Sequence, residues 1–179
     1  IVECNTAYPG ERNTTDAHRR TMIKHGWSKL FDVGILDAEG PDLELPIPNG
    51  KRIQKNLVGK DIKNYDSMLV LSHFKGHPMG GFGGALKQLS IGCASSAGKA
   101  NIHGAGKPEE MWTAEQNAFL ESMADAAESV VKLFDGKIVY INVMKNMSVD
   151  CDCCAVAEDP CMKDIGILAS LDPIAIDRA

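Results

Sequence analysis

The strongest constraint on the fold is a long amphipathic helix signal that runs directly into a short apolar segment. Between Thr113 and Phe134, apolar residues recur every three or four positions, which places them on one face of a helix. Thr113 and Gln116 fit a capping box, and Asp135-Gly136 predicts the helix end. Lys137–Val143 follows as the clearest strand signal in the chain. A helix joined this closely to a strand is typical of α/β proteins.

Other apolar runs fit the same architecture. Ile1–Asn5 predicts a strand, residues 14–25 predict a helix and Phe31–Leu36 predicts a second strand, which together form a β-α-β unit. Ser67–Ser72 and Ile165–Ala169 are further strand signals. We therefore expect an α/β fold with a mainly parallel sheet flanked by helices.

The sequence contains no linker that would divide it, so we expect a single α/β domain over residues 1–179. The chain lacks an initiating Met and stops soon after Asp172-Pro173, which predicts the start of a helix. We therefore expect a fragment of a longer chain, truncated at both ends. Asp37–Lys60 predicts a loop or small hairpin, and the Gly-rich stretch His73–Gly106 predicts a long loop that includes Ser90–Lys99.

Charge and cysteine distribution exclude several classes of protein. The formal net charge of −5 argues against a nucleic-acid platform, because such surfaces need clustered Lys and Arg. The apolar runs are far shorter than the roughly 20 residues of a membrane span. Four of the six cysteines fall together near the end of the chain, unlike the spread of a secreted disulfide scaffold. We expect a reducing compartment, the cytoplasm.

The cysteine cluster is the strongest candidate for a metal site. Cys151 and Cys153 form a Cys-x-Cys pair on a predicted loop after a strand, and Cys161 follows eight residues later. Thiolates are soft donors that bind zinc and iron–sulfur clusters. We therefore predict that these three residues hold an iron–sulfur cluster or a divalent metal such as zinc. Cys154 is the weakest candidate, because adjacent cysteines rarely ligate one ion.

Two other interpretations of this cluster stay open. The thiols could be structural, either free or joined in a disulfide, or they could serve redox or catalytic chemistry. Asp150, Asp152 and Glu158 lie among the cysteines. Negative neighbours raise the pKa of a thiol, so we expect them to oppose reactive thiolates.

A second candidate site follows the strand Ser67–Ser72. The histidines and lysines there are candidates for acid–base chemistry and for neutralising charge: His73, Lys75, His77 and Lys87. The glycines can bring backbone N–H groups close to a carboxylate or phosphate: Gly80, Gly81, Gly83 and Gly84. The alternative is a tight turn with satisfied histidines. The glycine spacing does not match a dinucleotide-binding fingerprint.

A few other polar residues have simpler expected roles. We expect His103 to be a surface or satisfied histidine, and Asp172 to cap the last helix. Asp177 should be a solvated helix residue. Cys4 and Cys93 should be small buried side chains.

Three stretches together resemble a known family: Val70–Lys87, Val149–Cys153 with Asp159–Cys161, and Asp164–Pro173. They are similar to the bacterial family of uncharacterised iron–sulfur-centre proteins known as domain of unknown function 362. The resemblance covers nearly the whole chain and implies an iron–sulfur association, although the ferredoxin-like segment of many members is absent from this sequence. It places any active site at these positions: His73, Lys75, His77, Lys87, Cys151, Cys153 and Cys161.

Three hypotheses for the function follow. The first is a metal- or iron–sulfur-binding protein, in redox chemistry with a redox partner. The second is an enzyme acting on an anionic small molecule at the loop around His73. The third is a non-catalytic interaction module with structural thiols. None of them involves nucleic acid or a membrane, and the oligomeric state stays open.

Overall fold

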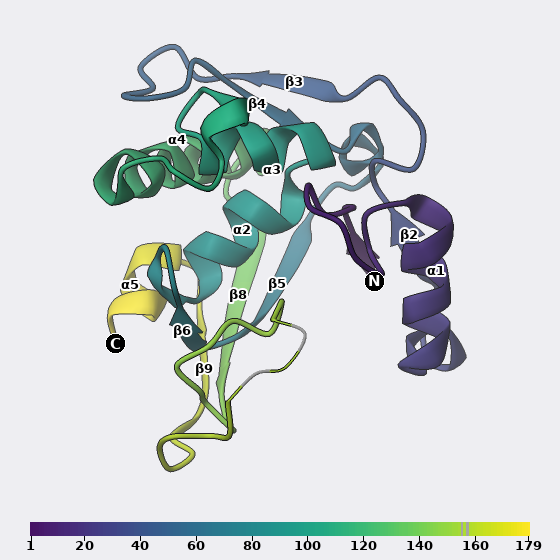
Figure 1. Ribbon diagram of the computed structural model, residues 1–179, viewed down its shortest axis with the longest axis vertical. Coiled ribbons are helices and arrows are strands. Elements are labelled where there is room, and N and C mark those ends of the chain that lie inside the picture. Colours follow the sequence, from purple (N-terminus) through teal and green to yellow (C-terminus); the bar gives the residue numbers. More distant parts are fainter. Residues whose placement is uncertain (155, 157) are drawn as a thin grey trace.

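The computed structural model describes residues 1–154, 156 and 158–179. The chain combines strands and helices, which follow one another in groups (Figure 1). The strands are β1 (Val2–Glu3), β2 (Gly34–Ile35), β3 (Leu43–Pro46), β4 (Lys55–Val58), β5 (Met68–His73), β6 (Lys75–His77), β7 (Gly81–Gly83), β8 (Ile138–Met144) and β9 (Gly166–Ser170). The α-helices are α1 (Thr15–Lys24), α2 (Ala85–Cys93), α3 (Ser96–His103), α4 (Gln116–Phe134) and α5 (Pro173–Arg178). Short 3-10 helices are η1 (Trp27–Lys29), η2 (Lys60–Asn64) and η3 (Pro108–Glu110).

The strand pairings are mixed, so the fold is α/β but the expected mainly parallel sheet is not confirmed. β1 pairs with β2 in parallel, and β5 pairs with β8 in parallel. β9 runs antiparallel to β8 and completes a three-stranded sheet in the order β5-β8-β9. β3 with β4, and β6 with β7, are antiparallel pairs, so the segment predicted as a loop or small hairpin contains a hairpin.

The long helix and its following strand lie close to where the sequence predicts them. α4 ends at Phe134 and β8 begins at Ile138. The expected capping box at Thr113 and Gln116 is wrong by two residues, because the cap is Glu115. Its carboxylate accepts hydrogen bonds from the backbone N–H groups of Asn117 and Ala118 at 3.0 and 2.9 Å.

The prediction of a loop over Ser90–Lys99 is also wrong, because α2 and α3 occupy most of that stretch. The glycines and small side chains that imitate a loop in the sequence permit close packing. A Cβ at Gly98 would lie 2.0 Å from the backbone oxygen of Leu57, so α3 approaches β4 more closely than a larger residue would allow. Ser95 caps α3 by accepting from the N–H of Gly98.

The core lies between the sheet and the helices on one of its faces. α2 crosses β5 and β8 in Figure 1, and α4 packs against α2. The buried side chains of this cluster include Val70, Leu89, Val130, Phe134 and Tyr140. A second cluster lies beneath the β3–β4 hairpin, around Ile47, Ile102 and Phe119. These contacts fix α2 over the ends of β5 and β8.

The opposite face of the β5-β8-β9 sheet is apolar and open. Leu69 and Leu71 on β5 are 59% and 55% exposed, whereas Val70 between them is 4% exposed. Val139 on β8 and Ile167 on β9 are exposed on this open face as well. None of the helices in the described part of the chain is both long enough and apolar enough to cross a membrane.

Candidate functional site

The two segments that the sequence singles out meet in space. β5 and β8 are parallel neighbours, so the chain leaves both at the same edge of the sheet, where α/β proteins usually bind ligands. The N–H of Gly76 donates to the carbonyl of Ser148 at 2.8 Å. A Cβ at Gly76 would lie 2.0 Å from the backbone oxygen of Val149, so only glycine permits this approach. The two predicted sites are therefore one site.

The β6–β7 hairpin presents Lys75 and His77 to the cysteine loop. Lys75 pairs with Gly83 and His77 pairs with Gly81. Residues two apart on a strand point to the same face, and both side chains are buried. The hairpin thus directs a lysine and a histidine into the same environment.

The sulfur of Cys151 is the centre of this environment. Its side chain is 1% exposed, and its Sγ lies 2.7 Å from the Sγ of Cys153. The Nζ atoms of Lys75 and Lys87 donate to it at 3.4 and 3.9 Å. A buried sulfur with two ammonium neighbours is best stabilised as a thiolate.

The pKa of the Cys151 thiol is well below its usual value. The main cause is the hydrogen bond donated by the Cys153 thiol, with further lowering from His77 and Lys87, against the opposing effect of burial. Our expectation that the acidic neighbours would raise the thiol pKa is therefore wrong for Cys151. Lys87, which is distant in the sequence, contributes to this lowering although an aspartate flanks Cys151 on either side.

Cys153 is the accessible member of the pair. Its side chain is exposed, and its hydrogen bond to Cys151 raises its pKa. Tyr8 lies beside it, and burial raises the pKa of Tyr8 to about 12. Tyr8 also contacts the ring of Trp112, with ring centroids 5.8 Å apart. No motif in the sequence connects Tyr8 with the cysteines, which explains why our sequence analysis missed it.

Lys87 completes the cationic side of the site from α2. Burial lowers the pKa of Lys87, and the charge of Cys151 opposes that effect. The nearby thiolate therefore favours the protonated form of Lys87.

His73 holds the residue between the two cysteines. Its Nδ1 lies 2.8 Å from the Asp152 carboxylate, and its Nε2 lies 2.7 Å from the carbonyl oxygen of Lys145. Each ring nitrogen of His73 therefore faces an oxygen of a different segment. His73 thus connects the Cys-x-Cys segment to the end of β8.

Two backbone hydrogen bonds and an aromatic ring hold His77 in place. Its Nδ1 accepts hydrogen bonds from the N–H groups of Gly80 and Met79 at 2.9 and 3.3 Å. This leaves Nε2 to carry the proton in the neutral ring. The ring also stacks on Phe119, at a centroid distance of 6.4 Å. His103 stacks on Phe119 as well, at 5.0 Å, and its Nδ1 lies 2.7 Å from the carbonyl oxygen of Lys99.

Each of the four predicted cofactor-binding glycines has a different role in the structure. Gly80 donates to His77, and Gly81 has a φ of +75°, in the left-handed region that favours glycine. A Cβ at Gly83 would lie 3.3 Å from Nζ of Lys75, so glycine leaves space for that ammonium. A Cβ at Gly84 would lie 2.4 Å from the Asp177 carboxylate.

Asp177 occupies the N-terminus of α2, which the sequence predicts as part of an anion cradle. Its carboxylate accepts from the N–H groups of Ala85 and Leu86 at 2.7 and 2.9 Å and from the amide of Asn142 at 2.8 Å. Our expectation that Asp177 is solvated is therefore wrong. Asp172 caps α5 as predicted, accepting from Ile174 at 2.8 Å.

Cys161 lies apart from the other two predicted metal ligands. Its thiol faces the carbonyl of Met147 at 3.5 Å and is exposed. Within residues 1–154, 156 and 158–179, no group of three or more His, Cys, Asp and Glu side chains is placed to hold a metal ion. In this arrangement, two of the three predicted soft donors converge and the third does not.

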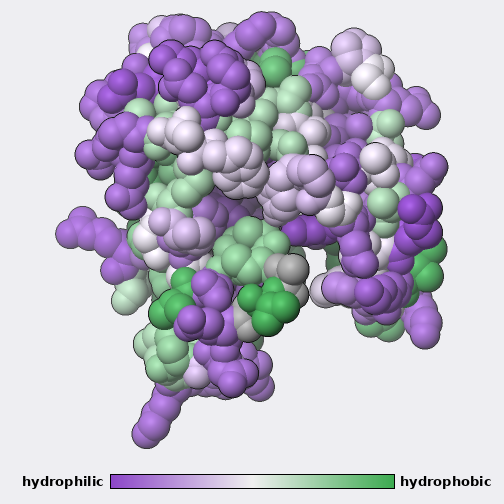
Figure 2. Space-filling view, in the orientation of Figure 1, coloured by the Kyte–Doolittle hydropathy of each residue, from purple (hydrophilic) through white to green (hydrophobic). Residues whose placement is uncertain are grey.

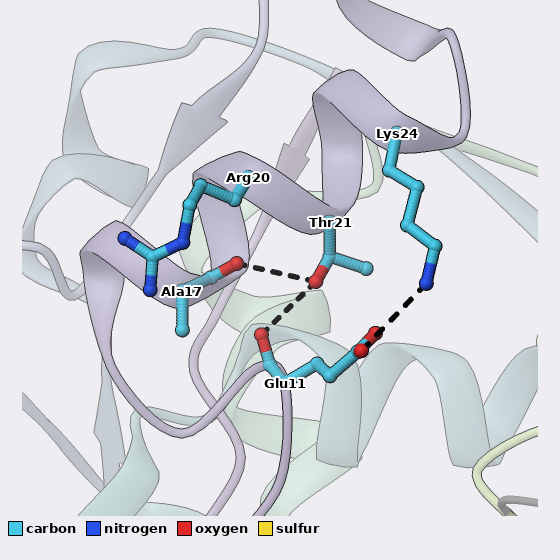
Figure 3. A pocket seen from close by; sticks show the side chains of 5 residues that line it. All are labelled: Glu11, Ala17, Arg20, Thr21 and Lys24. Atoms are coloured by element: carbon cyan, nitrogen blue, oxygen red, sulfur yellow. Dashed lines mark hydrogen bonds and ion pairs between the residues drawn. The ribbon is translucent and has the colours of Figure 1, made fainter.

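A surface hollow on α1 offers no rival site. It is lined by Glu11, Ala17, Arg20, Thr21 and Lys24 (Figure 3). The Thr21 hydroxyl bonds the carbonyls of Glu11 and Ala17, and Lys24 pairs with the Glu11 carboxylate at 3.7 Å. These groups hold the preceding loop against the helix, and none of them contacts the cysteines.

Fold and site together define an α/β protein with a dithiol beside two lysines. The chain belongs to the family described as Domain of unknown function (DUF362), whose family model matches residues 1–179. This membership confirms the resemblance seen in the sequence. Neither a search of curated proteins nor a search of solved structures finds a match to the chain.

Proposed function

We propose that this chain is a thiol–disulfide redox protein whose centre is the dithiol of Cys151 and Cys153. One observation carries the proposal: the two free sulfurs lie 2.7 Å apart, one buried against lysines and the other exposed. The buried sulfur is suited to be the leaving group, because a stabilised thiolate leaves faster. The exposed sulfur is suited to meet a partner. We also propose that the protein acts in the cytoplasm and exchanges electrons there with a redox partner.

The exchange begins from the Cys151–Cys153 disulfide. A thiolate of a dithiol partner attacks Sγ of Cys153, a bond forms between the two sulfurs, and Cys151 leaves as a thiolate beside Lys75 and Lys87. The second thiol of the partner then loses its proton and attacks the partner's own sulfur in the mixed disulfide. Cys153 leaves and takes up that proton, so the partner becomes a disulfide and the protein a dithiol. Two electrons pass from the partner to the protein.

The lysines determine the direction of this reaction. They stabilise the reduced form, in which Cys151 is charged, more than the neutral disulfide. Stabilising the reduced form of a dithiol makes its disulfide a stronger oxidant. The protein is therefore an acceptor of electrons from dithiols with more negative potentials.

A metal or iron–sulfur centre on Cys151, Cys153 and Cys161 is the second candidate. The convergence of the first two sulfurs favours it, since thiolates are the donors that such centres use. A bound cluster would supply one-electron transfer. Cys161 would have to move away from Met147 to join the other two sulfurs.

One preparation tests both candidates. Anaerobically purified protein is analysed for metal and acid-labile sulfide, then equilibrated with thiol–disulfide buffers, quenched and mapped by mass spectrometry. We expect a Cys151–Cys153 disulfide that a Cys153→Ser variant cannot form and that Cys154→Ser and Cys161→Ser variants retain. Iron and sulfide in a fixed ratio, lost in Cys161→Ser, would instead establish the second candidate.

A further inference from the structure

Two lysines from different elements depend on one anionic atom. Lys75 on β6 and Lys87 on α2 both donate to Sγ of Cys151. Lys75 is only 7% exposed. Within the part of the chain that the structure describes, neither ammonium group donates a hydrogen bond to any other atom. Their charge is balanced chiefly by the thiolate.

The nearest carboxylate does not replace that thiolate. An oxygen of Asp152 lies 4.0 Å from Nζ of Lys75, beyond hydrogen-bond distance. The same oxygen is bonded to His73 at 2.8 Å, and the Asp152 side chain is 52% exposed. Asp152 is therefore committed to another partner in a more solvated position.

The backbone anchors both lysines beside the sulfur of Cys151. Lys75 is fixed by the pairing of β6 with β7, and Lys87 lies on the helix whose first turn is capped by Asp177. Gly83 lies between them, and a Cβ there would be 3.3 Å from Nζ of Lys75 and 3.6 Å from Cδ of Lys87. The backbone positions of both lysines are therefore fixed, and both side chains lie against Gly83.

We propose that oxidation of Cys151 converts this lysine pair into a binding site for a small oxyanion, such as phosphate, sulfate or a carboxylate. The proposal rests on the thiol–disulfide function above, in which the disulfide carries no charge on Cys151. Lys75, which is buried, and Lys87, which is half-buried, then lack the anionic sulfur that balances their charge, which is unfavourable for both ammonium groups. An oxyanion restores the charge and accepts hydrogen bonds from both ammonium groups.

An anion that binds one redox form more tightly than the other changes the reduction potential of the Cys151–Cys153 couple. An anion that binds the disulfide form and not the dithiol form makes the disulfide harder to reduce, by linkage. Above its dissociation constant, each tenfold rise in anion concentration favours the disulfide tenfold, which for two electrons is about 30 mV. The anion level thus sets the oxidising strength of the site.

The first experiment measures the redox equilibrium of the whole chain at several sulfate concentrations, with chloride holding the ionic strength constant. We expect the potential to fall as sulfate rises. Lys75→Met and Lys87→Met should each remove the dependence. Lys145→Met, which changes an exposed lysine at the end of β8, should retain it. A couple whose potential is independent of sulfate, or a dependence that survives both site substitutions, overturns this inference and leaves the redox function standing.

A second experiment needs no disulfide. The Cys151→Ser variant removes the thiolate permanently, so calorimetric titration with sulfate should show binding at least tenfold tighter than in the reduced wild-type protein. Adding Lys87→Met to the Cys151→Ser variant should abolish sulfate binding. If this variant binds sulfate but no Cys151–Cys153 disulfide ever forms, the redox function fails alone. If the variant binds no more sulfate than the reduced protein, the anion site does not exist.

Discussion

At the scale of single residues, the environment of a side chain overrides what its sequence neighbours predict. Cys151 lies next to an aspartate on either side in the sequence, yet its thiol pKa is lowered. The largest cause is the thiol of Cys153, two positions further on, and His77 on β6 and Lys87 on α2, which only the fold brings near, lower the pKa further. His103 shows the opposite case, in which burial alone dominates.

His103 should make the protein less stable in acid. Burial lowers its pKa from 6.5 to about 4, so the unfolded chain takes up a proton below pH 6.5 that the folded protein does not. Stability from this residue is complete above pH 6.5 and falls as the pH drops toward 4, by on the order of 3 kcal/mol. Urea unfolding of wild type and His103→Gln at several pH values measures the difference.

The control for this prediction is His25→Gln, since His25 is exposed at the end of α1. Its unfolding free energy should follow the wild-type dependence on pH. If His103→Gln also follows the wild-type curve between pH 6.5 and 4, His103 does not stay neutral in the folded state.

At the scale of elements, the important contact joins α5 to the start of α2. The helix begins at Gly84 without a side-chain cap of its own, and Asp177 from the end of the chain supplies the carboxylate. Helix N-termini favour negative charge, so this contact stabilises α2. It also explains why glycine stands at position 84.

Gly84→Ala should destabilise the protein by about 1–3 kcal/mol, because the new Cβ would lie 2.4 Å from Oδ1 of Asp177. Gly92→Ala, on the same helix, is the matched control. Its Cβ would meet only the flexible side chain of Gln88, at 3.1 Å, so it should be neutral or stabilise by up to about 1 kcal/mol. Denaturant unfolding compares them, and equal effects would mean that Asp177 does not occupy this position.

Local patterns predict some elements well and others not at all. The α4–β8 pair follows from apolar periodicity, which sequence carries directly. α2 and α3 are missed because Gly98 and its small neighbours resemble a loop, while α3 packs against β4 and α2 packs against α4 and β5. The candidate site is predicted in its parts, the Cys-x-Cys pair and the lysines. The lysines converge on one sulfur only in the tertiary structure, and the same is true of the contact between Asp177 and α2. No spacing in the sequence predicts either contact.

At the scale of the whole molecule, the sheet is covered on one face and bare on the other. In the orientation of Figure 1, the surface is mostly hydrophilic, and hydrophobic residues gather toward the end where the segment between β8 and β9 lies (Figure 2). Val149 and Met162 in that segment are exposed, as are the side chains of the open sheet face. Side chains on the covered face of β5 should therefore contribute more to the free energy of unfolding than those on its open face.

Truncations on the two faces of β5 should reveal this difference. Val70→Ala removes methyl groups from the core and should cost about 2 kcal/mol of unfolding free energy. Leu71→Ala, on the open face, should cost less than about 1 kcal/mol despite removing more atoms. Denaturant titration measures both, and a Leu71 effect as large as that of Val70 would mean that the open face is covered in solution.

The contact between Asp177 and Ala85 has a consequence for the order in which the site forms during synthesis. It joins residues 92 positions apart, and α2 carries Lys87. The ribosome makes the chain from its N-terminus, so the sulfur, both lysines and the hairpin are all synthesised before the carboxylate that caps α2. A nascent chain can thus assemble the dithiol early, but the helix on which one of its cations lies reaches its final stability only after Asp177 has been added.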